Sequence, residues 1–277
     1  MKHAIEGAYT YLEFAACAAV WVPLLAASRA LHRHDDVPRH PGQWMRRFGR
    51  ITSRLTPLWD FTIEGEQPKD IHDRPYVVVA NHASTADPFL LAWLPWDMQW
   101  VAKAELFRWP VIGLLLKLSG DIPVRRGDGE SVRAMLSACR HALRNQLSVM
   151  LFPEGTRSGD GGVGVFKDGA FQLAIEEGAP VLPVAVAGTH RCMPKGSTWF
   201  GRARAIARVL EPIETRGLTV DDVPRIAQLA RDRVAAAVAE LEAELAGKEP
   251  RGAAARGTIA SSKHRPAAHA VLGATLR

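Results

Sequence analysis

A histidine and an aspartate five residues apart, His82 and Asp87, are the first side chains whose spacing points to chemistry. On a helix the two would lie about 140° apart around the axis, and on a strand they would face opposite sides of the sheet. They can therefore meet only if the chain turns between them. A histidine held by a carboxylate through one ring nitrogen can use the other nitrogen as a general base. Such a base could remove the proton of an alcohol that attacks an acyl carbonyl.

The sequence offers this pair no nucleophile of its own. It contains no GxSxG elbow, and none of its cysteines, Cys17, Cys139 and Cys192, stands near His82. Direct acyl transfer to an external hydroxyl is therefore favoured over an acyl-enzyme intermediate. The cysteines also lack the spacing of zinc ligands, so we expect no metal site and a reducing environment. Taken alone, the pair would still be typical of an ordinary surface or core contact.

Residues 152–158, with the sequence FPEGTRS, form a second group of polar side chains. The proline and Gly155 favour a tight loop, which would bring together the carboxylate of Glu154, the hydroxyl of Thr156 and the guanidinium of Arg157. Arg157 can bind a phosphate through two parallel hydrogen bonds, and Glu154 can accept hydrogen bonds from polyol hydroxyls. An isolated loop of this kind would otherwise be an ordinary turn with a salt bridge.

Short apolar runs that alternate with helical stretches must position both groups. The runs are rich in β-branched residues and predict buried strands at 76–80, 148–152 and 181–186, with further strands at 122–124 and 203–210. The predicted helices cover residues 88–93, 131–144, 169–177 and 223–245. This alternation predicts an α/β fold with a layered sheet. Pro123 makes the strand at 122–124 short or places it at an edge.

The segment with the histidine and the aspartate fits the carboxyl end of a strand. The strand ends at Ala80, the polar residues 81–86 follow, and Asp87 and Pro88 would be the N-cap and first position of a helix. In α/β folds, such strand–turn–helix connections hold the functional sites. The glycine-rich residues 159–164 follow no strand in the dinucleotide-binding manner, so we expect a loop there.

An uncharged apolar run at residues 14–27 favours contact with a membrane. As a helix it would cover about 21 Å, which is less than the hydrocarbon core of about 30 Å. Glu13 precedes the run, and Pro23 would kink the helix near its end. We therefore expect a segment that dips into one leaflet. A cleaved signal peptide and a helix that spans the membrane are the alternatives.

Both ends of the chain are basic. Arginine and histidine recur from Arg29 to Arg54, which is typical of a helix that lies on anionic headgroups. The anchors of that helix at the interface would be Trp44, Phe48 and Trp59. Residues 247–277 are rich in alanine, glycine and basic side chains without periodicity, so we expect disorder there.

The composition permits one substantial domain and excludes wholesale disorder. The chain has 277 residues, of which 47% are hydrophobic and 23% are charged. Its net charge of +6 suits an anionic membrane, a phosphorylated substrate or a nucleic acid. Aromatic residues are not interleaved with the basic tail, which disfavours a nucleic-acid binding module.

Four segments resemble, in order and spacing, the motifs of the glycerolipid acyltransferases. Residues 81–87 (NHASTAD) look like the NHxxxxD motif, and residues 152–158 match the FPEGTRS motif residue for residue. Residues 120–126 (GDIPVRR) are similar to the intervening motif that ends in arginine, although Pro123 replaces its usual aromatic residue. Residues 181–184 (VLPV) match the last, proline-containing motif. The resemblance points to the lysophosphatidate acyltransferase (PlsC-type) branch.

The resemblance implies a role for each matched residue. His82 would be the base, with Asp87 as its orienting partner. The cationic side chains of the substrate site would bind the phosphate of the acceptor, and its glutamate would contact the glycerol. The weaker match around Pro123 leaves open whether Arg125 or Arg126 serves. The implied substrate-binding residues are Glu154, Gly155, Thr156, Arg157, Arg126 and Lys103.

The resemblance also implies a fold and its divisions. We expect a mixed β-sheet flanked by helices, preceded by a membrane-associated helical segment. The segment would cover residues 1–60, the acyltransferase domain residues 61–246, and the basic tail residues 247–277. The catalytic domain would lie on the cytoplasmic side of the inner membrane.

These observations predict an enzyme that transfers an acyl chain from acyl-CoA or acyl carrier protein to the free hydroxyl of a lysophospholipid. The expected acceptor is lysophosphatidate and the product is phosphatidate. We expect no metal or redox cofactor, and we expect membrane lipids and the acyl donor, but no nucleic acid, as partners. The alternatives are another lyso-acceptor such as a lyso-ornithine lipid, a lipid hydrolase in which His82 activates water, and a non-catalytic binding module.

Overall fold

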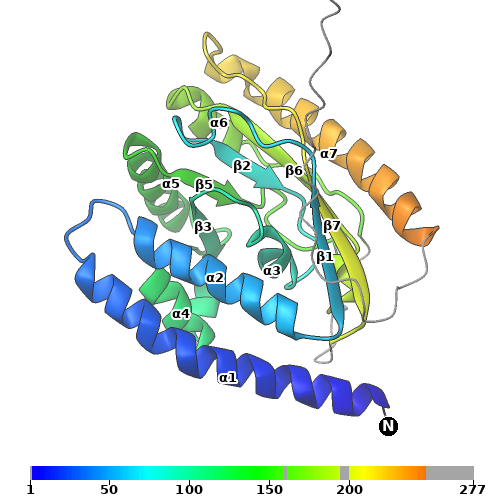
Figure 1. Ribbon diagram of the computed structural model, residues 1–277. Helices are drawn as coiled ribbons and strands as arrows, with labels where there is room; N and C mark the ends of the chain where they lie inside the picture. Colours follow the sequence, from blue (N-terminus) through cyan, green and yellow to red (C-terminus); the bar gives the residue numbers. More distant parts are fainter. Residues whose placement is uncertain (1, 159–160, 194–199, 248–277) are drawn as a thin grey trace, which may run out of the picture.

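A computed structural model describes residues 2–158, 161–193 and 200–247 of the chain. Within these residues a seven-stranded sheet has the order β1-β7-β6-β2-β5-β3-β4 (Figure 1). All neighbouring strands are parallel except β6 and β7, which are antiparallel, so the predicted mixed sheet is confirmed. The strands are Trp59–Glu64 (β1), Val77–Ala80 (β2), Met98–Lys103 (β3), Ile122–Val124 (β4), Ser148–Leu151 (β5), Val181–Ala187 (β6) and Ala203–Val209 (β7).

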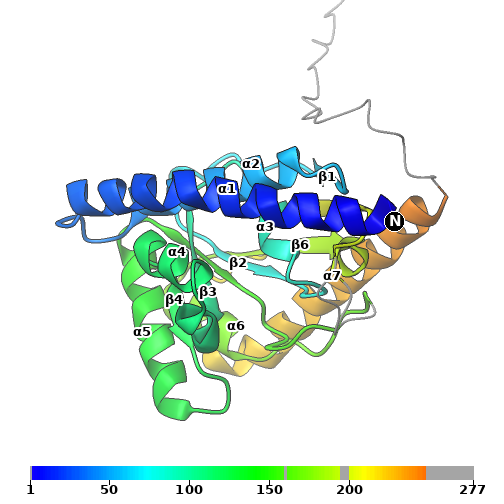
Figure 2. The ribbon, with the colours of Figure 1, turned by 90° about the horizontal axis from the view of Figure 1, so that it is seen from below.

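Helices cover both faces of this sheet (Figure 2). In β2, Val77 and Val79 pack into the core beneath α5, α6 and α7, whereas Val78 and Ala80 pack on the side of α3. Because both faces are buried, β2 has an uninterrupted apolar sequence rather than an alternating one. The α-helices are Lys2–Leu31 (α1), Arg39–Leu55 (α2), Asp87–Leu91 (α3), Ile112–Ser119 (α4), Gly129–Arg144 (α5), Gly169–Glu176 (α6) and Val223–Ala246 (α7). Single turns of 3-10 helix lie at Ala104–Arg108 (η1), Thr189–Arg191 (η2) and Val220–Asp222 (η3).

The five predicted strands and four predicted helices all occur, with ends shifted by a few residues. Strand β4 lies at the edge of the sheet, as Pro123 predicts. Strands β1 and β3 were not predicted, because their sequences WDFTIE and MQWVAK mix polar and apolar residues and most of their side chains are only partly buried. Helix α4 was also missed, since its apolar run is too short to show a helical period. Residues 159–160 of the expected loop and residues 248–277 of the expected tail lie outside the described residues.

The N-terminal helix is longer than the sequence analysis expected. Helix α1 has 30 residues and continues through Pro23, which corresponds to about 45 Å. Among the described residues, Gly7–Leu31 is the one helical stretch long and apolar enough to cross a membrane. The expected segment was shorter because Glu13 precedes the uncharged apolar run of residues 14–27. Ser28, the residue after the run, is also polar. Both side chains are buried against the rest of the molecule. The helix therefore includes these two polar residues without exposing them to solvent or lipid.

Helix α2 is attached to the sheet by a side chain that was expected to lie on headgroups. Arg46 is 6% exposed, forms an ion pair with Asp97 and donates a hydrogen bond to the carbonyl oxygen of Met98 at 3.1 Å. Phe48, expected as an interfacial anchor, is 2% exposed and packs between α1 and α4. The expectations for Arg46 and Phe48 were wrong, because the face of α2 that carries them packs against the rest of the protein and not against a membrane.

Replacement of Arg46 by alanine should loosen α2 from the sheet. The change removes a buried cation from Asp97 and a donor from the Met98 carbonyl, which should lower the free energy of unfolding by about 2 kcal/mol. Urea unfolding in detergent micelles measures this effect. Arg54→Ala, at an exposed position of the same helix, is the matched control and should change stability by less than about 0.5 kcal/mol. Equal stability of the two variants would contradict a docking role for Arg46.

Candidate active site

The turn between β2 and α3 brings His82 and Asp87 together. Nδ1 of His82 lies 2.6 Å from Oδ2 of Asp87. The Asp87 side chain is fully buried, whereas 13% of the His82 side chain is exposed. The same Oδ2 accepts hydrogen bonds from the backbone amides of Ala83 and Ser84 at 2.9 and 3.0 Å. The carboxylate therefore holds the Nδ1 proton of His82, which leaves Nε2 as the nitrogen that can accept a proton.

Asp87 does not cap α3, contrary to the prediction. The N-cap residue is Ala86, and Asp87 is the first residue of the helix, followed by Pro88. The carboxylate turns back toward residues 82–84, where its hydrogen-bond donors lie. Its negative charge thus serves the histidine and the preceding turn rather than the amides at the start of α3.

Asn81 attaches the start of this turn to the neighbouring strand β6. Its side-chain amide donates to the carbonyl oxygen of Val186 and accepts from the amide of Val186, both at 2.8 Å. The pattern imitates a pair of strand hydrogen bonds after β2 itself has ended. Asn81 is fully buried, so it fixes where the chain leaves the sheet. Asn81 is the first residue of the NHxxxxD motif, and the sequence predicted no role for it.

Glu154 connects the His–Asp turn to the loop that follows β5. Its Oε1 accepts a hydrogen bond from the amide of His82 at 2.7 Å, and its Oε2 accepts one from the amide of Gly164 at 3.0 Å. The amide of Ser158 donates to the carbonyl oxygen of His82 at 2.9 Å. Burial raises the pKa of the Glu154 carboxyl, while the two amides lower it. The sequence did not predict this positioning role, and a contact of Glu154 with glycerol stays a prediction.

Phe152 supports the ring of the proposed base. The rings of Phe152 and His82 stack with centroids 4.2 Å apart and 21° between their planes. This contact restricts rotation of the imidazole and covers one of its faces. Phe152 is the first residue of the FPEGTRS motif, and the sequence predicted no role for it. Its position directly after β5, at the edge where β2 also ends, was the signal available.

Two glycines in the segment after β5, Gly155 and Gly164, let neighbouring side chains approach the backbone closely. Gly155 has a φ of +68°, in the left-handed region that favours glycine. A Cβ atom on Gly155 would lie 2.9 Å from Nζ of Lys167, so an ammonium group lies against this loop. A Cβ atom on Gly164 would lie 2.8 Å from Oε2 of Glu154. Lys167 and Gly164 were not among the predicted site residues.

Cationic side chains gather next to this loop, at the ends of β3 and β4. Burial lowers the pKa of the Arg126 guanidinium, the charge of Glu105 raises it, and the charge of Arg157 lowers it. Nζ of Lys103 lies 3.8 Å from Oε1 of Glu105. Arg126 therefore shares its surroundings with Arg157, and Glu105 links Lys103 to the group. Glu105 was not predicted, and Thr156 is exposed on the loop itself.

The two arginines that the sequence left undecided have different partners. Arg125 donates a hydrogen bond to Asp128 at 2.9 Å, and Asp128 in turn caps α5 through the amides of Glu130 and Ser131. Arg126 is the one whose charge interacts with Arg157. This electrostatic interaction therefore groups Arg126, rather than Arg125, with Arg157 in the loop of residues 152–158.

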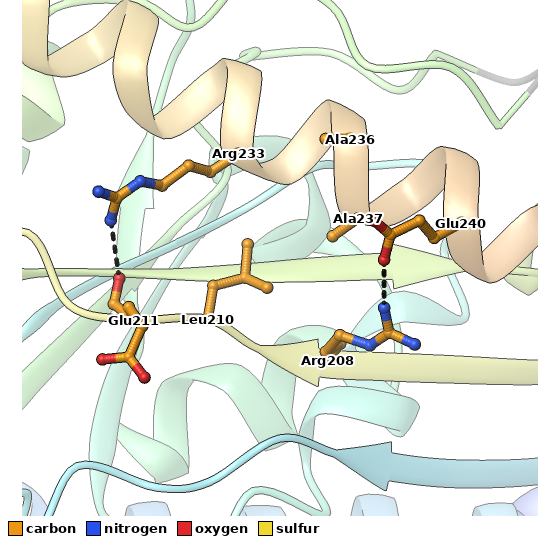
Figure 3. A pocket seen from close by; sticks show the side chains of 7 residues that line it. All are labelled: Arg208, Leu210, Glu211, Arg233, Ala236, Ala237 and Glu240. Carbon is orange, nitrogen blue, oxygen red and sulfur yellow. Dashed lines mark hydrogen bonds and ion pairs between the residues drawn. The ribbon is translucent and has the colours of Figure 1, made fainter.

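A separate hollow of about 400 Å³ lies between β7 and α7 (Figure 3). Arg208, Arg233 and Glu240 contribute to its lining, and Arg208 is paired with Glu240 at 2.9 Å and with Glu64 at 2.9 Å. Arg208 is thus already neutralised by carboxylates, and Arg233 donates to the backbone carbonyl oxygen of Glu211 at 3.4 Å. None of the residues that line it belongs to the predicted site, so we assign it no part in the chemistry.

The relatives found by comparison with known proteins are described as acyltransferases. The family model described as "Acyltransferase" matches residues 61–187. A 1-acyl-sn-glycerol-3-phosphate acyltransferase of Saccharomyces cerevisiae is 31% identical over 209 residues, which cover 73% of this chain and 68% of that protein. A chloroplastic protein of the same description from Brassica napus is 38% identical over 161 residues, covering 56% of this chain and 47% of that protein. The chain thus spans about half the length of the plant protein that it matches.

One solved structure resembles nearly the whole chain. It is the 1-acyl-sn-glycerophosphate acyltransferase PlsC of Thermotoga maritima, with a TM-score of 0.70 and 25% sequence identity. The superposition covers 90% of this chain and 100% of that chain. The similarity therefore extends beyond the residues matched by the family model to the N-terminal helices.

Replacement of Gly164 by alanine should break the link between Glu154 and His82. The added methyl group would meet Oε2 of Glu154 and displace the carboxylate. We expect the His82 amide to exchange its hydrogen on the order of 10-fold faster, with a stability loss of about 1–2 kcal/mol. Hydrogen exchange followed by mass spectrometry measures the first effect. Gly169→Ala is the control, because no atom lies within 4 Å of its added Cβ. Unchanged exchange at His82 would contradict the proposed bridge.

Proposed function

The chain belongs to the acyltransferase family that includes the 1-acyl-sn-glycerol-3-phosphate acyltransferases, and we propose that it acylates the free hydroxyl of lysophosphatidate to give phosphatidate. The observation that carries the proposal is the Nδ1–Oδ2 distance of 2.6 Å between His82 and Asp87. This contact prepares Nε2 to accept a proton at the edge of the sheet where Arg157 and Arg126 lie. A base beside a cationic group suits an acceptor that carries both a hydroxyl and a phosphate.

In the proposed reaction His82 removes the proton of the acceptor hydroxyl. The oxygen forms an ester bond with the acyl carbonyl of a thioester donor, and the carbon–sulfur bond breaks. The thiolate then takes the proton from Nε2, which restores the neutral base. Asp87 orients the ring and stabilises the imidazolium that forms on the way. Acyl-CoA or acyl carrier protein would supply the thioester. The bonds made and broken require neither a metal nor a redox cofactor.

We expect the positive charges at the ends of β4 and β5 to bind the phosphate of the acceptor. Arg157 and Arg126 lie close enough for their charges to interact, an arrangement that costs free energy until an anion lies between them. Lys103 and Lys167 border the same group, at Glu105 and at Gly155 respectively. Glu105 partly compensates the cations before the substrate arrives.

Helix α1 offers a surface for the membrane in which the acceptor dissolves. Leu12, Val20 and Leu31 on this helix are 72%, 53% and 80% exposed. Trp109, just after η1, and Leu114, in α4 beside α1, are also exposed. We place these side chains in one leaflet, with the acyltransferase domain on the cytoplasmic side of the inner membrane. The lysolipid could then reach His82 without leaving the interface.

Replacement of His82 by alanine should abolish most of the acyl transfer. Loss of a general base lowers kcat by about 100- to 10,000-fold. Asp87→Asn should lower kcat by at least about 100-fold, because an amide cannot hold the same tautomer or stabilise the imidazolium. Transfer of labelled acyl groups from acyl-CoA to lysophosphatidate by the purified enzyme measures both. His72→Ala, at an exposed histidine in the turn before β2, is the control. Near-normal turnover in His82→Ala would overturn the mechanism.

Replacement of Arg157 or Arg126 by glutamine should weaken binding of the phosphate. One lost charge-assisted contact raises KM for lysophosphatidate by about 10- to 100-fold. The rate with a monoacylglycerol that lacks phosphate should stay unchanged, since that acceptor never used the contact. Arg125→Gln is the matched control, because Arg125 is paired with Asp128. Equal loss of activity with both acceptors would argue that the arginines are structural, and a preference for lyso-ornithine lipid would identify another acceptor.

A further inference from the structure

Two histidines and an aspartate meet where α1 joins α2. Figure 1 shows this connection as the loop between the two helices. One potential ligand atom from each of His32, Asp35 and His40 lies within 4.8 Å of those of the other two. His32 directly follows α1, and His40 is in the first turn of α2. His32 is partly buried, and the other two side chains are exposed to solvent. The proposed acyl transfer uses none of these three residues.

The ring of His32 already has the tautomer that a metal ion needs. Its Nδ1 lies 2.9 Å from the carbonyl oxygen of Ser28, which can only accept, so the proton is on Nδ1. Nε2 of His32 then carries a free lone pair. Histidines that bind metal ions usually donate their other N–H to a carbonyl or carboxylate in this way, because the bond fixes both tautomer and ring orientation.

The two imidazole rings lie against each other. Their centroids are 3.9 Å apart and the planes differ by 19°. Neutral imidazole is the form that coordinates metal ions. An imidazole nitrogen binds a metal ion in the plane of its ring, so the exposed ring of His40 has to turn out of this stack for both histidines to reach one ion.

The carboxylate of Asp35 lies at a distance from His40 that suits two ligands of one metal ion better than a strong ion pair. Nδ1 of His40 and Oδ2 of Asp35 are 3.3 Å apart. A hydrogen bond between an imidazolium and a carboxylate is shorter, about 2.7–2.9 Å. Two ligands of a tetrahedral zinc ion, each about 2.05 Å from the metal, are about 3.4 Å apart. The spacing thus matches one edge of a zinc site.

The neighbouring cations are directed away from this cluster. Arg39 donates to the carbonyl oxygen of Gln146 at 2.7 Å, and Arg33 donates to His34 at 3.0 Å. The carboxylate of Asp35 would offset half of the charge of a divalent cation. Asp36 adds a second negative charge beside it in the sequence.

We propose that His32, Asp35 and His40 bind one zinc ion, with water in the remaining coordination position. The two nitrogens and one oxygen form a donor set that suits zinc and discriminates against magnesium. The ion would tie the end of α1 to the start of α2. Because Arg46 fixes α2 to the sheet, zinc would also fix the direction of α1, whose exposed apolar side chains are the proposed contact with lipid.

Isothermal titration of the full chain in detergent micelles tests this site. The affinity tag is removed, and the protein is treated with EDTA, dialysed and titrated with ZnCl2. We expect one equivalent of zinc to bind, and no binding of MgCl2. His32→Ala and His40→Ala should each weaken zinc binding at least 10-fold, whereas His72→Ala should leave it unchanged. Zinc should raise the Tm of the wild type and of His72→Ala, but not that of His40→Ala.

His32→Ala also loses the hydrogen bond to the carbonyl oxygen of Ser28, so a second variant separates zinc binding from an effect on folding. Asp35→Asn keeps the shape of an exposed side chain and should also weaken zinc binding. Far-UV circular dichroism confirms that each variant keeps its helices. Two results would overturn the proposal: absence of stoichiometric zinc binding by the wild type, or unchanged affinity in both His40→Ala and Asp35→Asn. The second result would assign the zinc to other histidines of the chain, such as His34.

Discussion

The fully buried carboxylate of Asp87 is the constraint on which the candidate site depends. A charge removed from water must be met by hydrogen-bond donors, and here the ring of His82 and the amides of Ala83 and Ser84 supply them, all at Oδ2. All three donors belong to one turn, so satisfying the charge also determines the shape of the turn. The same turn presents the amide of His82 to Glu154. The buried charge of Asp87 therefore orients His82 and also shapes the turn to which Glu154, in the loop after β5, is attached.

The order of the strands places the other groups around this turn. Strands β6, β2, β5, β3 and β4 lie side by side, and all of them run in the same direction. Their carboxyl ends therefore form one edge. Passing along that edge from β2, one meets His82, then Phe152 and the loop after β5. Next come Lys103 at the end of β3 and Glu105 just after it, and finally Arg126 after β4. A base at one end and cations at the other match an acceptor with a hydroxyl and a phosphate.

The N-terminal helices combine attachment to the domain with an apolar outer face. Arg46 buries its charge against Asp97 and the start of β3, and Phe48 packs with residues of α1 and α4. The exposed apolar residues of α1 are thus held in a defined relation to the sheet edge. We propose that this relation lets a lysolipid reach His82 from the leaflet, and that zinc at the α1–α2 connection stiffens it.

The sequence by itself determined the strands with continuous apolar runs, the turn required by the His82–Asp87 spacing and the loop chemistry of residues 152–158. These features are local, because they follow from side-chain period, turn residues and the order of functional groups. Tertiary structure alone decided that Glu154 bridges His82 and Gly164, that Arg126 rather than Arg125 lies with Arg157, and that Arg46 is buried. Each of these contacts joins residues far apart in the chain, and neither periodicity nor spacing encodes which distant backbone amide or charge a side chain will meet.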